Sequence, residues 1–212
     1  MKEGTRGFTV VELLVSMAVA GVVMAGVYLT FYSQQKSYVT QTAVAAMQQN
    51  LRAAMHHLKH EIRMAGYDPE GTAEAGIVSA LNDSIQVTMD LNGDGDTDDQ
   101  DEDVTYRLYD ADGDGIIDLG RQTPSGTEMA AENIDALDFV YLDSSGAQTA
   151  DPDEIRSVQI TVVARVRRAD PGHSDSTQYV NQQGTVIYSA PGDGFRRDLL
   201  TAEVKCRNLG LE

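Results

Sequence analysis

The first long run of hydrophobic positions extends from Phe8 to Phe31 and contains one charged residue, Glu12. As a helix rising 1.5 Å per residue, the run would span about 36 Å, which exceeds the roughly 30 Å hydrocarbon core of a bilayer. A secretory signal peptide has a shorter apolar stretch, followed by a small-residue cleavage site and a break. Neither follows here, so the pattern predicts a membrane-spanning helix over residues 8–32.

A hydrophobic stripe then continues at spacings of three and four positions, as on one face of an amphipathic helix. Polar and basic residues fill the other faces, and Gly66 with Pro69 is a stop signal. This predicts that the helix continues over residues 33–66. The stripe consists of Val39, Ala43, Met47, Leu51, Met55, Leu58, Ile62 and Ala65.

Beyond residue 67 the period changes to the alternation typical of strands with one buried face. Such runs lie near residues 85–89, 104–108, 134–141, 158–164, 186–188 and 200–206, separated by Gly, Asp, Pro or Ser clusters. Long crossovers between these runs are missing, which favours antiparallel pairing. The predicted fold is α+β: a long N-terminal helix, membrane-spanning in its first half, packed against an antiparallel β-sheet head of residues 67–212. The single cysteine, Cys206, shares a face with Val204, which predicts a buried, unpaired thiol.

Charge is distributed unevenly along the chain. The formal net charge is −17, which argues against nucleic acid as a partner because a binder presents a positive surface to phosphates. Residues 67–212 hold thirty acidic and ten basic residues, and twelve of the acids lie between Asp90 and Asp118, opposed only by Arg107. This concentration indicates a local site.

The first acidic segment, residues 90–101, has the oxygen-ligand spacing of an EF-hand loop. Gly95 occupies loop position 6, where a sharp turn is needed, and the segment resembles the calcium loops of dockerins. We expect it to bind calcium between two strands and to order the head; a solvated acidic turn is the alternative. The candidate ligands are Asp90, Asn92, Asp94, Asp96, Asp98 and Asp101, the last in place of the usual glutamate.

A second segment, residues 110–121, repeats part of this pattern. Arg121 stands at position 12, so this site is incomplete unless a neighbouring acid closes it. Its candidate ligands are Asp110, Asp112, Asp114 and Asp118.

A histidine pair and the absence of catalytic motifs bear on whether the protein has a reactive site. His56 and His60, four residues apart on a helix, are within reach of one metal ion, although the order HHLKHE differs from the HExxH of metalloproteases. A solvated or subunit-facing surface is the alternative. Nucleophile, phosphate-binding and dinucleotide-binding motifs do not occur in the sequence, so we expect a protein that is not an enzyme.

Glu12 is unusual, because a carboxylate inside a spanning helix costs about 2.5–3.5 kcal/mol and such residues are generally functional. The sequence around it, Gly7-Phe8-Thr9-Val10-Val11-Glu12, resembles the processing site of type IV prepilins. The resemblance implies that residues 1–7 are a leader and that a prepilin peptidase cuts between Gly7 and Phe8. It also implies that Phe8 is N-methylated and that Glu12 pairs with the Phe8 amine of a neighbouring subunit in the fibre.

Within this family the chain resembles the PilW-like minor pilins. The resemblance rests on Leu51, Leu58 and residues 62–67 of the helix, and on Arg196-Arg197 and Arg207-Asn208 near the C-terminus. It implies a structural subunit that helps to initiate or cap a type IV pilus. The implied partners are other minor pilins, the major pilin, a tip adhesin and the inner-membrane assembly platform.

The expected location follows from the same reading. Lys2 and Arg6 precede the apolar run, so the positive-inside rule places the N-terminus in the cytoplasm and the head in the periplasm. The subunit would lie in the inner membrane, in contact with lipid, and later in the extracellular pilus. Two alternatives stay open: a minor pseudopilin of type II secretion, and a membrane-anchored calcium-dependent binding module. The latter would need neither a cleavage site after Gly7 nor Glu12.

Overall fold

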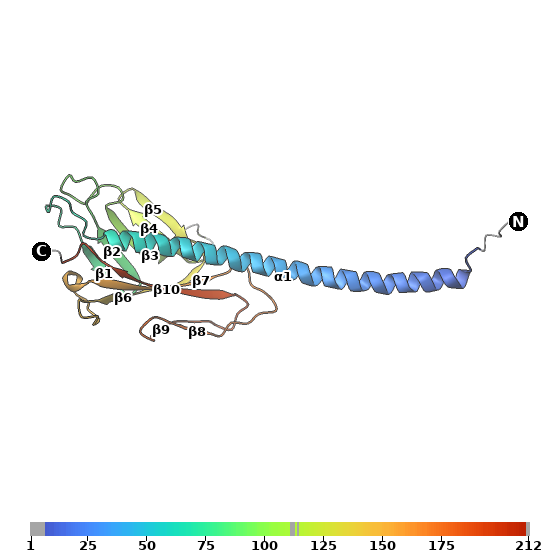
Figure 1. Ribbon diagram of the computed structural model, residues 1–212. Coiled ribbons are helices and arrows are strands. Elements are labelled where there is room, and N and C mark those ends of the chain that lie inside the picture. Colours follow the sequence, from blue (N-terminus) through green and yellow to red (C-terminus); the bar gives the residue numbers. More distant parts are fainter. Residues whose placement is uncertain (1–6, 111–112, 114, 211–212) are drawn as a thin grey trace. The chain divides into compact units, whose positions relative to one another are not determined.

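The computed structural model of the chain describes residues 7–110, 113 and 115–210. The chain forms two compact units, Met1–Thr42 and Ala43–Glu212, and helix α1 (Val10–Met64) contributes to both. The second unit joins the end of α1 to antiparallel sheets (Figure 1). This confirms the predicted α+β class.

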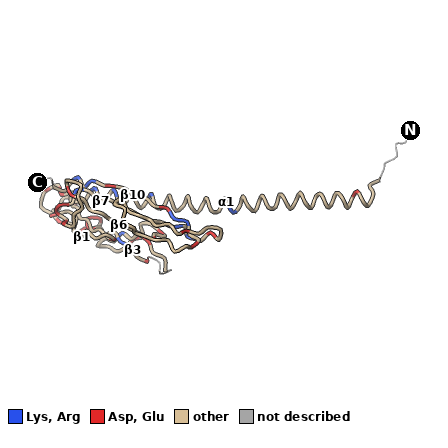
Figure 2. Tube along the Cα trace, turned by 90° about the horizontal axis from the view of Figure 1, so that it is seen from below, with Lys and Arg blue, Asp and Glu red and all other residues tan. Residues whose placement is uncertain are grey.

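The first half of α1 is apolar and exposed. Among the described residues, α1 is the one helix that is long and apolar enough, by length and composition, to cross a membrane. The most apolar stretch of this helix is not buried against the rest of the described chain. Figure 2 shows that charged positions are sparse along this half of the helix and concentrated in the head. Within the predicted stripe, Val39 is 61% exposed, Ala43 is partly buried, and the first buried residue is Met47.

Where the second unit is described, ten strands and one short 3-10 helix, η1 (Pro152–Glu154), follow α1. The strands form a five-stranded sheet in the order β1-β2-β3-β4-β5, a three-stranded sheet in the order β10-β7-β6, and a β8-β9 hairpin. Every strand pair is antiparallel. Their bounds are β1 Ile77–Ala80, β2 Ser84–Thr88, β3 Asp103–Tyr109, β4 Asp118–Thr123, β5 Gly126–Ala131, β6 Ile134–Leu142, β7 Ser157–Arg165, β8 Gln178–Val180, β9 Val186–Ser189 and β10 Arg197–Lys205.

One hydrophobic core joins the second half of α1 to both larger sheets. Leu58 and Ile62 of the helix are fully buried in one cluster with Ile85 of β2 and Ile160 of β7. β7 lies between β10 and β6, and its residues 157–164 are buried on both faces, as expected for a central strand rich in Val and Ile. The helix ends at Met64, and Gly66 (φ +78°) follows in the turn, where a Cβ would stand 2.5 Å from the Leu209 side chain.

Six strands lie where alternation predicted them, and β1, β4, β5 and β8 were not predicted. β4 and β5, with the sequences DLGRQT and GTEMAA, lack regular apolar alternation. They are strands because β4 pairs with β3, whose Val104 and Tyr106 are fully buried, and β5 in turn pairs with β4. β4 therefore occupies residues that the sequence pattern had placed in the second acidic loop.

Candidate functional site

Helix α1 begins with a capping box formed by Thr9 and Glu12. The N–H and Oγ1 of Thr9 both donate to Glu12 Oε2 at 2.9 Å, and the Glu12 N–H donates to Thr9 Oγ1 at 3.3 Å. This reciprocal arrangement satisfies N–H groups that the first turn of a helix cannot pair internally. The Thr-x-x-Glu spacing is a sequence signal for it. Gly7 and Phe8 precede the helix and are exposed, so Glu12 lies one turn from the predicted cleavage point.

The first acidic segment connects β2 to β3 and folds around the Asp90 carboxylate. Asp90 is fully buried, and its two oxygens accept from Gly93 N at 2.5 Å and Gly95 N at 3.1 Å. Its own N–H donates to the carbonyl of Tyr67, just after α1, at 2.7 Å. Gly95 has φ +90°, and a Cβ there would stand 2.7 Å from Thr72 Oγ1, so this turn requires glycine.

Three carboxylates converge in this loop. Asp90, Asp94 and Glu102 each present an oxygen, and these oxygens lie within 4.8 Å of one another. Asp90 and Glu102 are buried and Asp94 is exposed. Glu102 was not among the predicted ligands because it falls one position beyond a twelve-residue loop.

Asp101, which was predicted to close the loop, is engaged elsewhere. Its backbone is left-handed (φ 70°), and its carboxylate pairs with Arg121 Nη2 at 2.7 Å. The same guanidinium pairs through Nε with Glu61 of α1 at 2.8 Å. In this structure Arg121 of β4 therefore holds the carboxylate that was predicted to close the loop.

The other predicted ligands of this loop lie at its exposed rim. The Asn92 amide donates to Asp94 at 2.9 Å and to Asp99 at 2.7 Å. A hydrogen bond with Asp96, together with repulsion from the neighbouring acids, raises the pKa of Asp98. Like charges are therefore crowded in this loop.

The second acidic segment is only partly comparable. Asp110 accepts from Gly113 N at 2.8 Å and Gly115 N at 3.1 Å, as Asp90 does from Gly93 and Gly95 in the first loop. Asp112 and Asp114 lie outside the described residues. Asp118 is a buried residue of β4, and its carboxylate accepts from Asn133 N at 2.8 Å. Asp118 and Arg121 are therefore strand residues, contrary to the predicted loop of residues 110–121.

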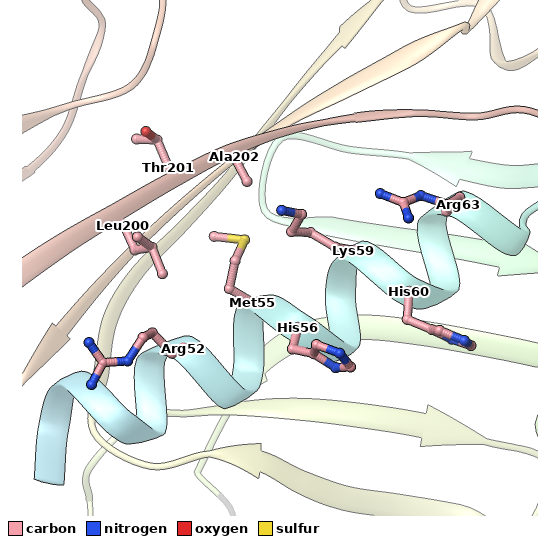
Figure 3. A pocket seen from close by; sticks show the side chains of 9 residues that line it. All are labelled: Arg52, Met55, His56, Lys59, His60, Arg63, Leu200, Thr201 and Ala202. Atoms are coloured by element: carbon pink, nitrogen blue, oxygen red, sulfur yellow. The ribbon is translucent and has the colours of Figure 1, made fainter.

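The predicted histidine pair borders a groove of about 510 Å³ between α1 and β10. Figure 3 shows Met55 and Lys59 directed toward Leu200 and Ala202 of β10, with His56 and His60 on another side of the helix. Within the described residues, the histidines do not join a group of three metal-ligating side chains. The groove also carries Arg52 and Arg63, which give it a positive rim suited to anionic groups.

Sequence reasoning missed a buried ionic cluster around Arg197. This side chain is 1% exposed and contacts Asp135 at 2.6 Å, Asp193 at 2.7 Å and Asp175 at 3.2 Å. The pKa of Arg197 is raised, mainly by its hydrogen bond to Asp193. Burial opposes ionisation of Asp175, but hydrogen bonds from Thr177 and other donors outweigh it and lower its pKa to about 2. The cluster attaches the β8–β9 region to β10 and β6.

Cys206 is buried and free, as predicted from its alternation with Val204. Burial raises the pKa of its thiol to about 12. A thiol that stays protonated is a poor nucleophile, so Cys206 serves in packing.

Comparison with known proteins places this geometry in a family. Residues 4–28 match the prokaryotic N-terminal methylation motif, and residues 40–183 match prepilin peptidase-dependent protein B. The fold is similar to that of a type IV-like pilin, TTHA1219 from Thermus thermophilus, with a TM-score of 0.53 and 16% sequence identity. That match covers 77% of this chain and 98% of the other. A comparison with curated proteins finds no match in sequence. The chain, whose apolar N-terminal helix suits a membrane-anchored pilin, is a type IV pilin-family protein and belongs to the prepilin peptidase-dependent protein B family.

Proposed function

We propose that the chain is a minor pilin, a structural subunit that helps to initiate or cap a type IV pilus, with a head stabilised by calcium. The proposal rests on the arrangement of residues at the start of α1. Gly7 and Phe8 directly precede a capped helix, and the large apolar side chains of residues 10–39 are exposed within the described chain. An apolar surface of this length needs a cover, which lipid supplies before assembly and the helices of other subunits supply in a fibre.

The proposed route follows from this arrangement. The basic N-terminal residues stay in the cytoplasm, the apolar half of α1 spans the inner membrane, and the head lies in the periplasm before moving to the extracellular pilus. Prepilin peptidase removes residues 1–7, and Phe8 becomes the methylated N-terminus. Other minor pilins, the major pilin, a tip adhesin and the assembly platform are the proposed partners. A role in packing and assembly suits the structural family and requires no enzymatic activity.

Processing is the first test. Intact mass and N-terminal sequencing of the membrane-matured protein should find N-methylated Phe8 at its start. Gly7→Val should retain the leader, because a side chain at the scissile position crowds the peptidase. Wild-type protein that keeps residues 1–7 would overturn the proposal and favour a membrane-anchored calcium-dependent binding module.

A second test separates the two kinds of fibre. Deletion of the gene should reduce surface pili in electron micrographs and leave type II secretion unchanged. Normal pili with lost secretion would instead identify a minor pseudopilin.

A further inference from the structure

Glu102 is buried without a complete set of partners. Its side chain is 1% exposed. Oε1 accepts from Leu91 N at 2.8 Å and Asn92 N at 3.2 Å, whereas the buried Oε2 has no hydrogen-bond partner. A desolvated carboxylate oxygen with no donor is unfavourable unless a cation or a proton compensates it.

The neighbouring charges deepen this imbalance. Asp90 is also fully buried, and neither it nor Glu102 forms an ion pair with any described Lys, Arg or His. Asp94 adds a third carboxylate at the same point. The loop thus gathers negative charge, and the guanidinium of Arg121, which pairs with Asp101 at the end of the loop, also pairs with Glu61.

The spacing of the three acids fits a calcium ion. Calcium binds oxygen at about 2.3–2.6 Å, so two ligands of one ion are separated by at most about 5.2 Å. The ligand oxygens of Asp90, Asp94 and Glu102 lie within 4.8 Å of one another. An ion among them would lie beside the Glu102 carboxylate, whose buried Oε2 has no hydrogen-bond partner.

We infer that calcium binds between Asp90, Asp94 and Glu102, with Glu102 closing the site at loop position 13 and Asp101 held outside it by Arg121. This inference rests on the proposal that calcium stabilises the head. Bound calcium fixes the β2–β3 loop against the end of α1, since Asp90 N donates to Tyr67 O at 2.7 Å. Asp101 is a positioning residue, which links the loop to Glu61 of α1 through Arg121.

The test compares two adjacent substitutions in the full-length protein in detergent. Calcium chloride and magnesium chloride are titrated by calorimetry into wild type, Glu102→Gln and Asp101→Asn. We expect wild type to bind calcium with a Kd of roughly 10⁻⁴–10⁻³ M, as other extracellular modules do, and magnesium more weakly. Glu102→Gln should weaken calcium binding on the order of 10-fold or more, because one charged ligand is lost. Asp101→Asn should change it by less than about fivefold, as for a partly exposed ion pair.

Thermal unfolding separates a ligand from a merely structural residue. In chelator, Glu102→Gln should melt at or above the wild-type temperature, because the amide removes a buried charge and retains Oε1. With calcium, wild type should gain stability and the variant should not. A variant that melts below wild type in chelator and still responds to calcium would show a structural role and overturn the inference.

Two other results would also overturn the inference. Asp101→Asn losing calcium while Glu102→Gln keeps it would restore the twelve-residue loop and overturn the inference, leaving the calcium-stabilised head intact. Wild type that fails to bind calcium would overturn both calcium statements. Fibre incorporation and N-terminal processing would still judge the pilin proposal independently.

Discussion

Glu12 stands at the third position of α1, and its carboxylate accepts two hydrogen bonds from Thr9. The residue therefore has a local role at the helix start besides the assembly role that the prepilin resemblance implies. The two roles depend on different properties of the side chain. A capping box accepts Glu or Gln, whereas pairing with a neighbouring amine needs the negative charge.

Glu12→Gln should separate these roles. The variant keeps the capping oxygen, so membrane insertion should be retained, while its incorporation into fibres should fall at least about tenfold, because breaking a buried ion pair costs several kcal/mol. Quantitative immunoblotting of sheared pili against whole membranes measures the ratio. Thr9→Val, which removes the cap and keeps the charge, is the matched control and should lose far less. Equal incorporation of Glu12→Gln and wild type would mean that the charge is only tolerated.

The β8–β9 hairpin shows how one element depends on distant residues. It has little buried apolar surface, and Tyr179, Tyr188 and Val186 are partly or largely exposed. Its connections are polar. Arg197 of β10 contacts Asp175, just before the hairpin, and Asp193, just after it, and side chains of the hairpin turn donate hydrogen bonds to β6, β7 and β10. The Arg197 guanidinium also lies 5.2 Å from the Tyr188 ring centroid.

Arg197→Ala should destabilise the head by about 3–5 kcal/mol, because it leaves buried carboxylates without their cation. Denaturant unfolding of the full-length protein in detergent, followed by circular dichroism, measures the change. Arg196→Ala is the adjacent control. Arg196 is 37% exposed and pairs with Asp170, so its loss should cost about 1 kcal/mol or less. Similar losses for both variants would argue against a stabilising role specific to the buried cluster.

Asp175 should make the same cluster sensitive to acid. Its pKa is about 2 in the folded protein against an ordinary value of 3.8. A carboxyl with a depressed folded pKa contributes stability that is fully present above about pH 4 and is lost as the pH falls toward 2. Asp175 thereby contributes about 2 kcal/mol to the free energy of unfolding at neutral pH. Stability curves from pH 6 to 2 should therefore fall more steeply for wild type than for Asp175→Asn. Parallel curves would contradict this assignment.

At the scale of the whole molecule, none of the described residues of the first unit belongs to the buried core. The described core begins at Met47 and draws its other members from α1, the strands and the segments between them. Val10 to Val39 add large apolar surface that this core does not cover. The two units therefore have different solvent requirements.

A fragment starting at Gln34 should be soluble without detergent and unfold cooperatively, since it keeps every described core residue. The full-length chain should partition into detergent because its exposed apolar helix is retained. Phase separation in detergent and near-ultraviolet circular dichroism of the fragment's tyrosines provide the readouts. A fragment without a cooperative transition would show that the head needs the first unit in order to fold.

Local sequence determined the features with strong periodicity. The stripe from Met47 to Ala65 specified the buried helix face, and the alternation around Val158–Ala164 specified a strand. The Gly7–Phe8 site and its resemblance to prepilins also needed no tertiary information, because peptidases read extended chain. In each case, residues that are close together in the sequence are enough to predict the feature.

Tertiary structure decided what depends on distant partners. β4 and β5 lack regular apolar alternation; β4 is a strand because it pairs with β3, and β5 because it pairs with β4. Arg121 draws Asp101 away from the loop, and Glu102 is buried with an unpaired oxygen beside Asp90 and Asp94. Loop spacing alone could not show that Asp101 pairs with Arg121, because that guanidinium lies twenty residues away along the chain. The sequence by itself therefore determined the pilin-type helix and the acidic loop, and contacts with residues of another strand decided which acids lie together in that loop.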